Sequence, residues 1–185
     1  MEGKYGQAEA LFTQTLNDRR RVLGREHPDT LGTLADIASM YQREGKVGLA
    51  ETYATQALTG RRRVLGSQNA DTMKAATDLA LACVSQRKFT DGEPLAREAV
   101  DFGRKKQSAD WQRFRAESVL GASLLGQKKY SEAEPLLLEG YQGMLAQQTK
   151  MEAADRYYLT HARDLVVELY HAWGKAEKAV EWAKK

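Results

Sequence analysis

The hexamer Arg-Arg-Arg-Val-Leu-Gly fills residues 19–24 and recurs unchanged at residues 61–66, 42 positions later. Asp29-Thr30 likewise recurs as Asp71-Thr72 at the same step. A further marker continues along the chain at steps of 42, 42 and 41, as Ala8-Glu9, Ala50-Glu51, Gly92-Glu93 and Ala133-Glu134. Agreement at so many positions indicates a repeat array, in which each unit is one supersecondary structure stacked on its neighbours.

Each unit contains two amphipathic stretches separated by a corner. Between residues 27 and 45, apolar side chains recur at helical spacing, as Leu31, Leu34, Ile37, Ala38 and Tyr41. A second stripe follows the corner Gly45-Lys46, as Ala50, Tyr53, Ala54, Ala57 and Leu58. This spacing is typical of helices, and the small residues let two helix backbones approach closely. Because no stretch alternates as a strand does, we expect nine helices in an all-α fold, a right-handed α-solenoid of stacked antiparallel helix pairs.

Capping signals support this phasing. Pro28 suits the first turn of a helix, where its missing N–H would have had no partner. Asn69 is placed to cap the next helix, with Asp71 in the favourable acidic first turn. Thr90 with Glu93 and Ser131 with Glu134 have the spacing of capping boxes, which predicts two more helix starts.

The repeat divides residues 1–185 into a single array. We expect a half repeat at 3–24, full repeats at 27–66, 69–108 and 109–148, and a C-terminal repeat or cap at 150–185 whose first helix spans roughly 152–173. A half repeat leaves an apolar helix face uncovered. We therefore expect the chain to be part of a longer protein, with self-association possible through the exposed half repeat.

Composition narrows the class of protein. The 185 residues carry 28 Lys and Arg against 25 Asp and Glu, and the net charge of +3 is too small to predict a nucleic-acid or membrane partner. No apolar run reaches the length of a membrane span, and the first residues lack a signal-peptide pattern. We expect a cytoplasmic protein. The single cysteine, Cys83, takes the inward place that Tyr41 holds one repeat earlier, which predicts a buried core thiol.

At this point the residues resemble the tetratricopeptide repeat family. With Tyr41 on the family's aromatic position, the following residues fall on its signature positions: Leu34, Ile37, Ala38, Ala50, Ala54 and Ala57, then Ala76, Leu79, Ala80, Cys83, Gly92, Ala96 and Ala99, then Leu120, Gly121, Leu124, Ala133, Leu137 and Gly140. The period exceeds the usual 34. Together with the segment at residues 26–30, it is similar to the 42-residue repeats of kinesin light chain type. The chain also resembles the C-terminal repeat arrays of bacterial serine/threonine kinases.

Several fragments imitate catalytic or metal-binding motifs. Asp101-Phe102-Gly103 spells a kinase tripeptide, but the glycine-rich loop, strand lysine and catalytic loop of a kinase are missing. Residues 121–128 miss the phosphate-loop spacing by one and read as helix. His161, Asp164, Glu168 and His171 share one helix face, yet about 15 Å of helix separates the two imidazoles. We predict no catalytic residue, no metal and no cofactor, and hence no enzyme.

Basic triplets recur near the repeat period, at residues 19–21, 61–63 and 104–106. They could bind phosphate or an acidic partner. We favour a structural interpretation, because they end helices, where cations complement the carbonyl end of the dipole and Glu26, Asp29 and Asp71 follow nearby.

The resemblance implies a concave groove lined by the first helix of each repeat, and with it a function. The candidate groove residues are Asp36, Ser39, Arg43, Lys74, Thr77, Asp78, Arg115, Ser118, Asp164 and Glu168. The carboxylate clamp of the family's best-known peptide binders is missing, since Asp36 and Asp78 stand where the family often has Asn. A protein or peptide segment that is of mixed charge or extended fits better, with both aspartates able to accept its N–H groups. We expect a non-enzymatic scaffold that binds such a segment. The alternative is a structural, oligomerisation or regulatory module attached to a bacterial kinase.

Overall fold

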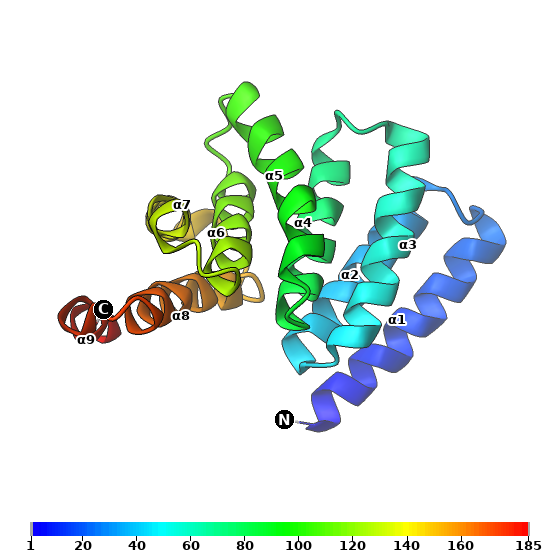
Figure 1. Ribbon diagram of the computed structural model, residues 1–185. Helices are drawn as coiled ribbons and strands as arrows, with labels where there is room; N and C mark the ends of the chain where they lie inside the picture. The colour runs from blue at the N-terminus through cyan, green and yellow to red at the C-terminus, as the bar shows by residue number, and fades with distance from the viewer. Residues whose placement is uncertain (1, 185) are drawn as a thin grey trace. The chain divides into compact units, whose positions relative to one another are not determined.

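The computed structural model describes the backbone of residues 2–184 and the side chains of residues 6–184. Within this range the chain forms nine α-helices, one 3-10 helix and no strand (Figure 1). The elements are α1 Glu2–Val22, α2 Pro28–Glu44, α3 Val47–Leu65, α4 Ala70–Ser85, α5 Phe89–Lys105, α6 Trp111–Gly126, α7 Tyr130–Ala146, η1 Gln148–Lys150, α8 Arg156–Ala172 and α9 Ala176–Ala183. The all-α prediction is confirmed over the described residues.

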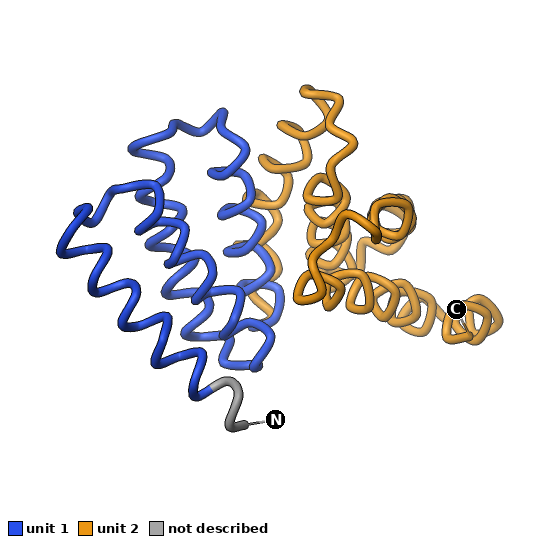
Figure 2. The backbone as a smooth tube through the Cα atoms, turned by 180° about the vertical axis from the view of Figure 1, so that it is seen from behind, with its two compact units in different colours: residues 1–86 blue, residues 87–185 orange. Residues whose placement is uncertain are grey.

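The helices fall into two compact units, residues 1–86 and residues 87–185, which Figure 2 shows in blue and orange. Unit 1 contains α1 to α4, and unit 2 contains α5 to α9 with η1. The division lies after Gln86, between the two helices of the predicted repeat 69–108.

In unit 1, small residues hold the helices close together. Each helix packs on the next one along the chain, and α2 also lies against α4. Ala50, Ala54 and Ala57 of α3 are at most 1% exposed, as the close approach of backbones predicted from the sequence requires. Cys83 is buried in this core, which confirms its predicted place.

In unit 2, glycine as well as alanine lets the helices pack closely. Here α6 packs on α5, α7 and α8, and α9 packs on α8. Gly140 of α7 lies so close to α6 that an added Cβ would come within 2.8 Å of the backbone oxygen of Phe114 and nitrogen of Ser118. The helix pair α6 and α7 therefore depends on a missing side chain for its spacing.

The capping signals are confirmed at two helices and wrong at two others. Pro28 opens α2, and the Asn69 side chain accepts from the backbone N–H of Asp71 at 2.8 Å. The predicted capping boxes do not form, because Lys88 and Lys129 hold the cap positions and Thr90 and Ser131 lie inside the first turns.

The acidic residues of those two boxes serve a different purpose. Glu93 binds Arg97, Gln127 and Lys129, and these partners lower the pKa of its carboxyl to about 2 against the opposing effect of burial. Glu134 accepts from the Tyr170 hydroxyl at 2.9 Å. Tertiary partners outcompete the local cap in both places.

A corner dipeptide that ends in lysine recurs at residues 45–46, 87–88, 128–129 and 174–175 and has one backbone geometry at these four places. Its first residue adopts a left-handed backbone conformation, with φ of 80° at Gly45, 61° at Arg87, 62° at Lys128 and 75° at Gly174. The lysine that follows reaches back to a glutamate of the preceding second helix, in the pairs Glu9–Lys46 at 3.5 Å, Glu93–Lys129 at 3.3 Å and Glu134–Lys175 at 3.9 Å. In these three places, the glutamate of the recurring Ala-Glu or Gly-Glu dipeptide therefore forms an ion pair with the lysine of the next corner.

The first helix of the last repeat is shorter than predicted. It begins at Arg156, whereas the sequence predicted a start near residue 152. The 3-10 helix Gln148–Lys150 and the buried side chain of Met151 hold the chain in a turn before α8 starts. From residue 2 to residue 184, none of the helices is both long and apolar enough to cross a membrane.

Candidate functional site

In unit 1, the candidate groove residues come from α2 and α4, two helices in contact. Asp36 is exposed, whereas Ser39, Arg43 and Lys74 are half-buried. Asp78 is only 6% exposed, so the second of the two predicted aspartates lies largely beneath the surface. We call Asp36, Ser39, Arg43 and Lys74 the unit 1 surface.

Asp36 is the central charge of the unit 1 surface. Desolvation by the surrounding helices raises the pKa of its carboxyl, and the charge of Asp78 adds to this rise. Lys74, Arg61 and Arg19 act in the opposite direction. Solvent therefore reaches this side chain, although the neighbouring helices partly desolvate its carboxyl.

Two predicted hydroxyls lie beneath the surface. Thr77 is 2% exposed and its Oγ1 donates to the backbone carbonyl of Met73 at 3.0 Å. Ser118 in unit 2 is 3% exposed. We therefore leave both residues out of the proposed contact surfaces.

In unit 2, the candidate residues come from α6 and α8, which also contact each other. The Arg115 guanidinium lies 3.9 Å from the ring centre of Tyr158 and is buried. Trp111, one turn before Arg115, stacks on the same ring at 6.3 Å. Arg115 is therefore part of an aromatic cluster, rather than an exposed cation as its place in the sequence suggested.

The cluster continues along α8. His161 stacks on Tyr157 at 5.9 Å, and the Tyr157 and Tyr158 rings meet edge to face at 5.4 Å. Burial lowers the pKa of His161, with Asp164 acting in the opposite direction and the charge of Arg115 adding to the decrease, so the environment favours the neutral imidazole. We call the half-buried residues Trp111, Tyr157 and His161 the unit 2 surface, and Arg115 and Tyr158 are buried next to them.

The two predicted carboxylates of α8 border this surface. Asp164 is exposed and pairs with Arg163 at 2.7 Å, and Glu168 is exposed one turn further on. The three aromatic residues of the cluster were missed as site residues by the sequence reasoning. Their signal was the four-residue step from Trp111 to Arg115 and from Tyr157 to His161, which places each pair on one helix face.

The sequence fragments that resemble catalytic and metal-binding motifs do not form such sites within the described residues. Asp101-Phe102-Gly103 lies inside α5, and Gly103 packs against the stem of Arg113. Among the side chains of residues 6–184, no three of the His, Cys, Asp and Glu type come together so as to hold a metal ion.

In the basic triplets 19–21 and 61–63, the first arginine has a structural role. Arg19 donates to the backbone carbonyl of Asp29, and Arg61 donates to that of Asp71, each at 2.9 Å. The two contacts are one repeat apart and identical. The partner is the backbone oxygen and not the nearby carboxylate that the sequence suggested.

Comparison with known proteins agrees with this architecture. Residues 1–63 match the family described as tetratricopeptide repeat. No curated protein matches the sequence.

Three solved structures illustrate the similarity in fold. Nearly identical TPR-like repeats from Podosopora anserina, named for kinesin light chain, are 20% identical, with a TM-score of 0.71 over 99% of this chain and 85% of that one. BtubC (BKLC) from P. vanneervenii is 20% identical, with a TM-score of 0.70 over 99% and 72%. The apo form of RapI is 11% identical, with a TM-score of 0.69 over 96% and 61%.

The fold therefore defines an all-α helical-repeat solenoid. The chain has the tetratricopeptide repeat fold and is similar to solved repeats of kinesin light chain type, which confirms the predicted resemblance to these repeats.

Proposed function

We propose that this chain is a non-enzymatic scaffold that binds an extended protein or peptide segment, and that the unit 1 surface and the unit 2 surface are each a candidate contact surface. The tetratricopeptide repeat fold generally serves protein binding without catalysis, which supports the class of function. Fold alone does not assign a partner, so the proposal depends on the chemistry of the two surfaces.

The observation that carries the proposal is the state of Asp36. Its carboxylate is accessible and partly desolvated, with Lys74 beside it. A hydrogen bond to such an acceptor is stronger than one in open water, because less water competes for it. An extended segment that presents a backbone N–H or a basic side chain would satisfy the acceptor.

The unit 2 surface offers a second kind of contact. Trp111, Tyr157 and His161 are half-buried and present ring faces, and the exposed carboxylates of Asp164 and Glu168 border them. Aromatic rings that are already packed lose little conformational entropy when a partner stacks on them. This surface suits a flat apolar or cationic side chain of a bound segment.

The test begins with linear peptides selected from a random library for binding to the whole chain. The tightest peptide is then titrated by fluorescence anisotropy against the chain and against the Asp36→Asn variant. We expect about tenfold weaker binding by Asp36→Asn, since the amide keeps the shape and loses a charged acceptor.

The matched control is Asp91→Asn, which removes an exposed carboxylate from the first turn of α5. Binding by this variant should stay within about twofold of the parent chain. Selected peptides that bind Asp36→Asn as tightly as they bind the parent chain would show that the unit 1 surface is not the binding surface.

A further inference from the structure

Two places in the molecule occupy the same position in the repeat and differ in chemistry. Junction 1 is the place where α1, α2 and α3 meet in unit 1, and junction 2 is the place where α5, α6 and α7 meet in unit 2. Two repeat steps relate the positions that line the two junctions, 84 residues for the pair in α1 and α5 and 83 residues for the other pairs. The corresponding pairs are Arg20 with Arg104, Thr30 with Arg113, Leu31 with Phe114, Leu34 with Glu117, and Gln56 with Glu139.

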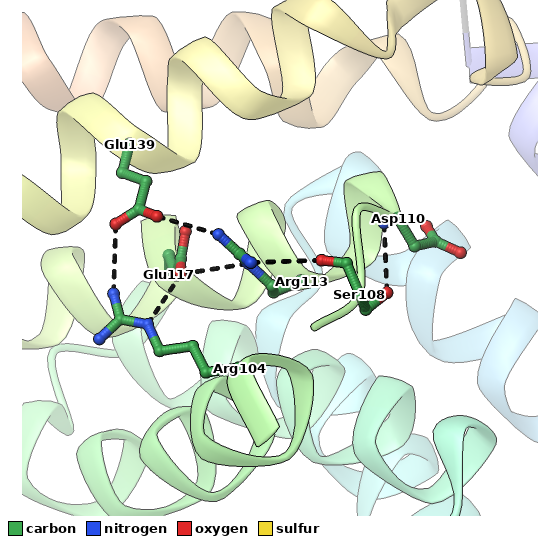
Figure 3. Close-up of polar contacts among 6 residues, drawn as sticks. All are labelled: Arg104, Ser108, Asp110, Arg113, Glu117 and Glu139. Carbon is green, nitrogen blue, oxygen red and sulfur yellow. Dashed lines mark hydrogen bonds and ion pairs between the residues drawn. The ribbon is translucent and has the colours of Figure 1, made fainter. Parts of the chain in front are cut away.

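In junction 2, the chain's own charges fill the positions that correspond to the lining of junction 1 (Figure 3), while a separate pocket lined in part by Leu120 and Leu124 lies elsewhere between these helices. The carboxylate of Glu139 accepts from Arg104 at 3.2 Å and from Arg113 at 2.9 Å. The same two arginines also pair with Glu117, at 3.1 Å and 3.4 Å. Two guanidinium groups thus meet two carboxylates, and the cluster is neutral.

The Phe114 side chain also fills part of junction 2. The Phe114 ring fills the space where Gly143 has no side chain, and its other face carries the Arg113 guanidinium at 4.6 Å. In junction 1 the smaller Leu31 meets the corresponding glycine, Gly60, and a pocket remains open.

The pocket of junction 1 is lined by three arginines and one carboxylate. Arg63 pairs with the only acidic residue in the lining, Glu26. Arg20 donates to the neutral side-chain oxygen of Gln56 at 3.2 Å. Arg25 is exposed and makes no ion pair with any residue whose side chain the structure describes. The lining therefore has two positive charges in excess.

We propose that junction 1 binds a carboxylate side chain of an acidic partner protein. The model for the bound state is junction 2, where Arg104 holds the carboxylate of Glu139 at the same 3.2 Å at which Arg20 holds Gln56. A carboxylate entering junction 1 meets Arg20 and Arg25 and gains the charge-assisted bonds that an amide oxygen does not supply.

This site is separate from the surface proposed for peptide binding. Leu34 lines junction 1 and Asp36 belongs to the unit 1 surface, and the two residues point about 200° apart around α2, because successive side chains turn by about 100°. The two proposals can therefore fail independently of each other.

The probe is hexaglutamate, with hexaglutamine as the uncharged control, titrated into the whole chain labelled with nitrogen-15. The side-chain Nε–Hε signals of the arginines report where the probe binds. Saturable shifts at Arg20, Arg25 and Arg63 with hexaglutamate, and none with hexaglutamine, are the expected result.

Two variants separate a built site from general charge attraction. Gln56→Glu supplies an internal carboxylate to Arg20, as in junction 2, and Arg25→Gln removes the arginine that has no acidic partner. Each should weaken hexaglutamate binding about fivefold. Arg156→Gln, which removes an exposed charge from α8, should change the affinity by less than about twofold. Circular dichroism confirms that each variant is folded.

Three outcomes would overturn the proposal. One is an equal loss of affinity for Arg156→Gln and Arg25→Gln, which would mean that net charge alone attracts the probe. Another is unchanged affinity for Gln56→Glu. The third is displacement of hexaglutamate by an equal concentration of inorganic phosphate, which would make junction 1 a phosphate site rather than a site for acidic protein segments.

Discussion

Junction 1 and junction 2 have the same backbone plan and the same arginine at the end of the second helix, yet they use that arginine differently. In junction 2, Arg104 pairs with Glu117 and Glu139 and helps to join α5, α6 and α7. In junction 1, Arg20 has a neutral amide as its partner, and two more arginines surround an open pocket. The repeated sequence therefore gives both junctions the same helices and the same arginine. The residues that face this arginine decide whether its charge joins the helices or is available to a ligand.

The two junctions also differ in whether a charged side chain is buried. Glu117 is fully buried, and burial raises the pKa of its carboxyl even though Arg113 and Arg104 lie beside it. A buried ion pair costs desolvation energy that its partners must offset, so removing one partner is more damaging than replacing the whole group. Junction 1 avoids this cost because Leu34 stands at the position of Glu117. Junction 2 should therefore be sensitive to single substitutions in a way that junction 1 is not.

The largest effect is expected from Arg113→Met. The variant keeps the apolar stem that packs on Gly103 and removes the guanidinium that contacts Glu117 and Glu139. Since Glu117 then stays buried with Arg104 alone, we expect the free energy of unfolding to fall by about 3 kcal/mol. Urea denaturation followed by circular dichroism measures the change.

The control for this prediction converts junction 2 toward junction 1. In the double variant Arg113→Met with Glu117→Leu, the buried carboxylate is replaced by the residue type found at Leu34. Most of the lost stability should return, because no charge is left stranded. A double variant no more stable than Arg113→Met would mean that the loss came from packing and not from an unpaired charge.

The elements were predictable from the sequence because the repeat supplies the same signals several times. Helical spacing of apolar residues placed the helix pairs, and Asn69 and Pro28 marked two starts correctly. The capping boxes were wrong because Glu93 and Glu134 have partners more than 30 residues away, among them Gln127 and Tyr170. A local pattern cannot show which of two partners a side chain prefers when the second comes from another repeat.

The candidate site was predictable in position and less so in exposure. Helix periodicity placed Asp36 and Lys74 on neighbouring helix faces, and the structure brings them together. It could not show that Arg115 lies buried against Tyr158, because that depends on how α8 packs on α6 after a repeat of unusual length. The pairing of Arg104 with Glu139 was hidden for the same reason, since 35 residues separate them.

A smaller effect is expected from the pH dependence of junction 2. Because the pKa of Glu117 is raised above its ordinary value of 4.5, the folded state keeps the proton to a higher pH than the unfolded state. The contribution of this group is fully present below pH 4.5 and is lost as the pH rises through the folded pKa. Relative to Glu117→Gln, the parent chain should lose stability as the pH rises across that window.

The measurement compares urea midpoints of the parent chain and Glu117→Gln at intervals between about pH 4 and pH 7. The oxygen Oε2 of Glu117 has no hydrogen-bond partner within the described residues, which is consistent with an easily protonated group. Parallel stability curves for the two proteins would show that Glu117 titrates alike in the folded and unfolded chain. In that case the two arginines would compensate fully for its burial.

The smallest effect is expected when junction 1 is given a carboxylate of its own. In Gln56→Glu the new group would face Arg20 at the distance at which Arg104 meets Glu139, in a partly exposed setting. An exposed ion pair is worth about 0.5 kcal/mol, and salt screens it. The free energy of unfolding should therefore rise by about that amount in dilute buffer and return to the parent value near 1 M sodium chloride.

The reverse change in junction 2, Glu139→Gln, should lower the free energy of unfolding by more, because it also removes a partner of Arg113, which contacts buried Glu117. Equal and opposite effects in the two junctions would contradict the distinction between them, since they would show that Glu139 acts only as a surface partner of Arg104.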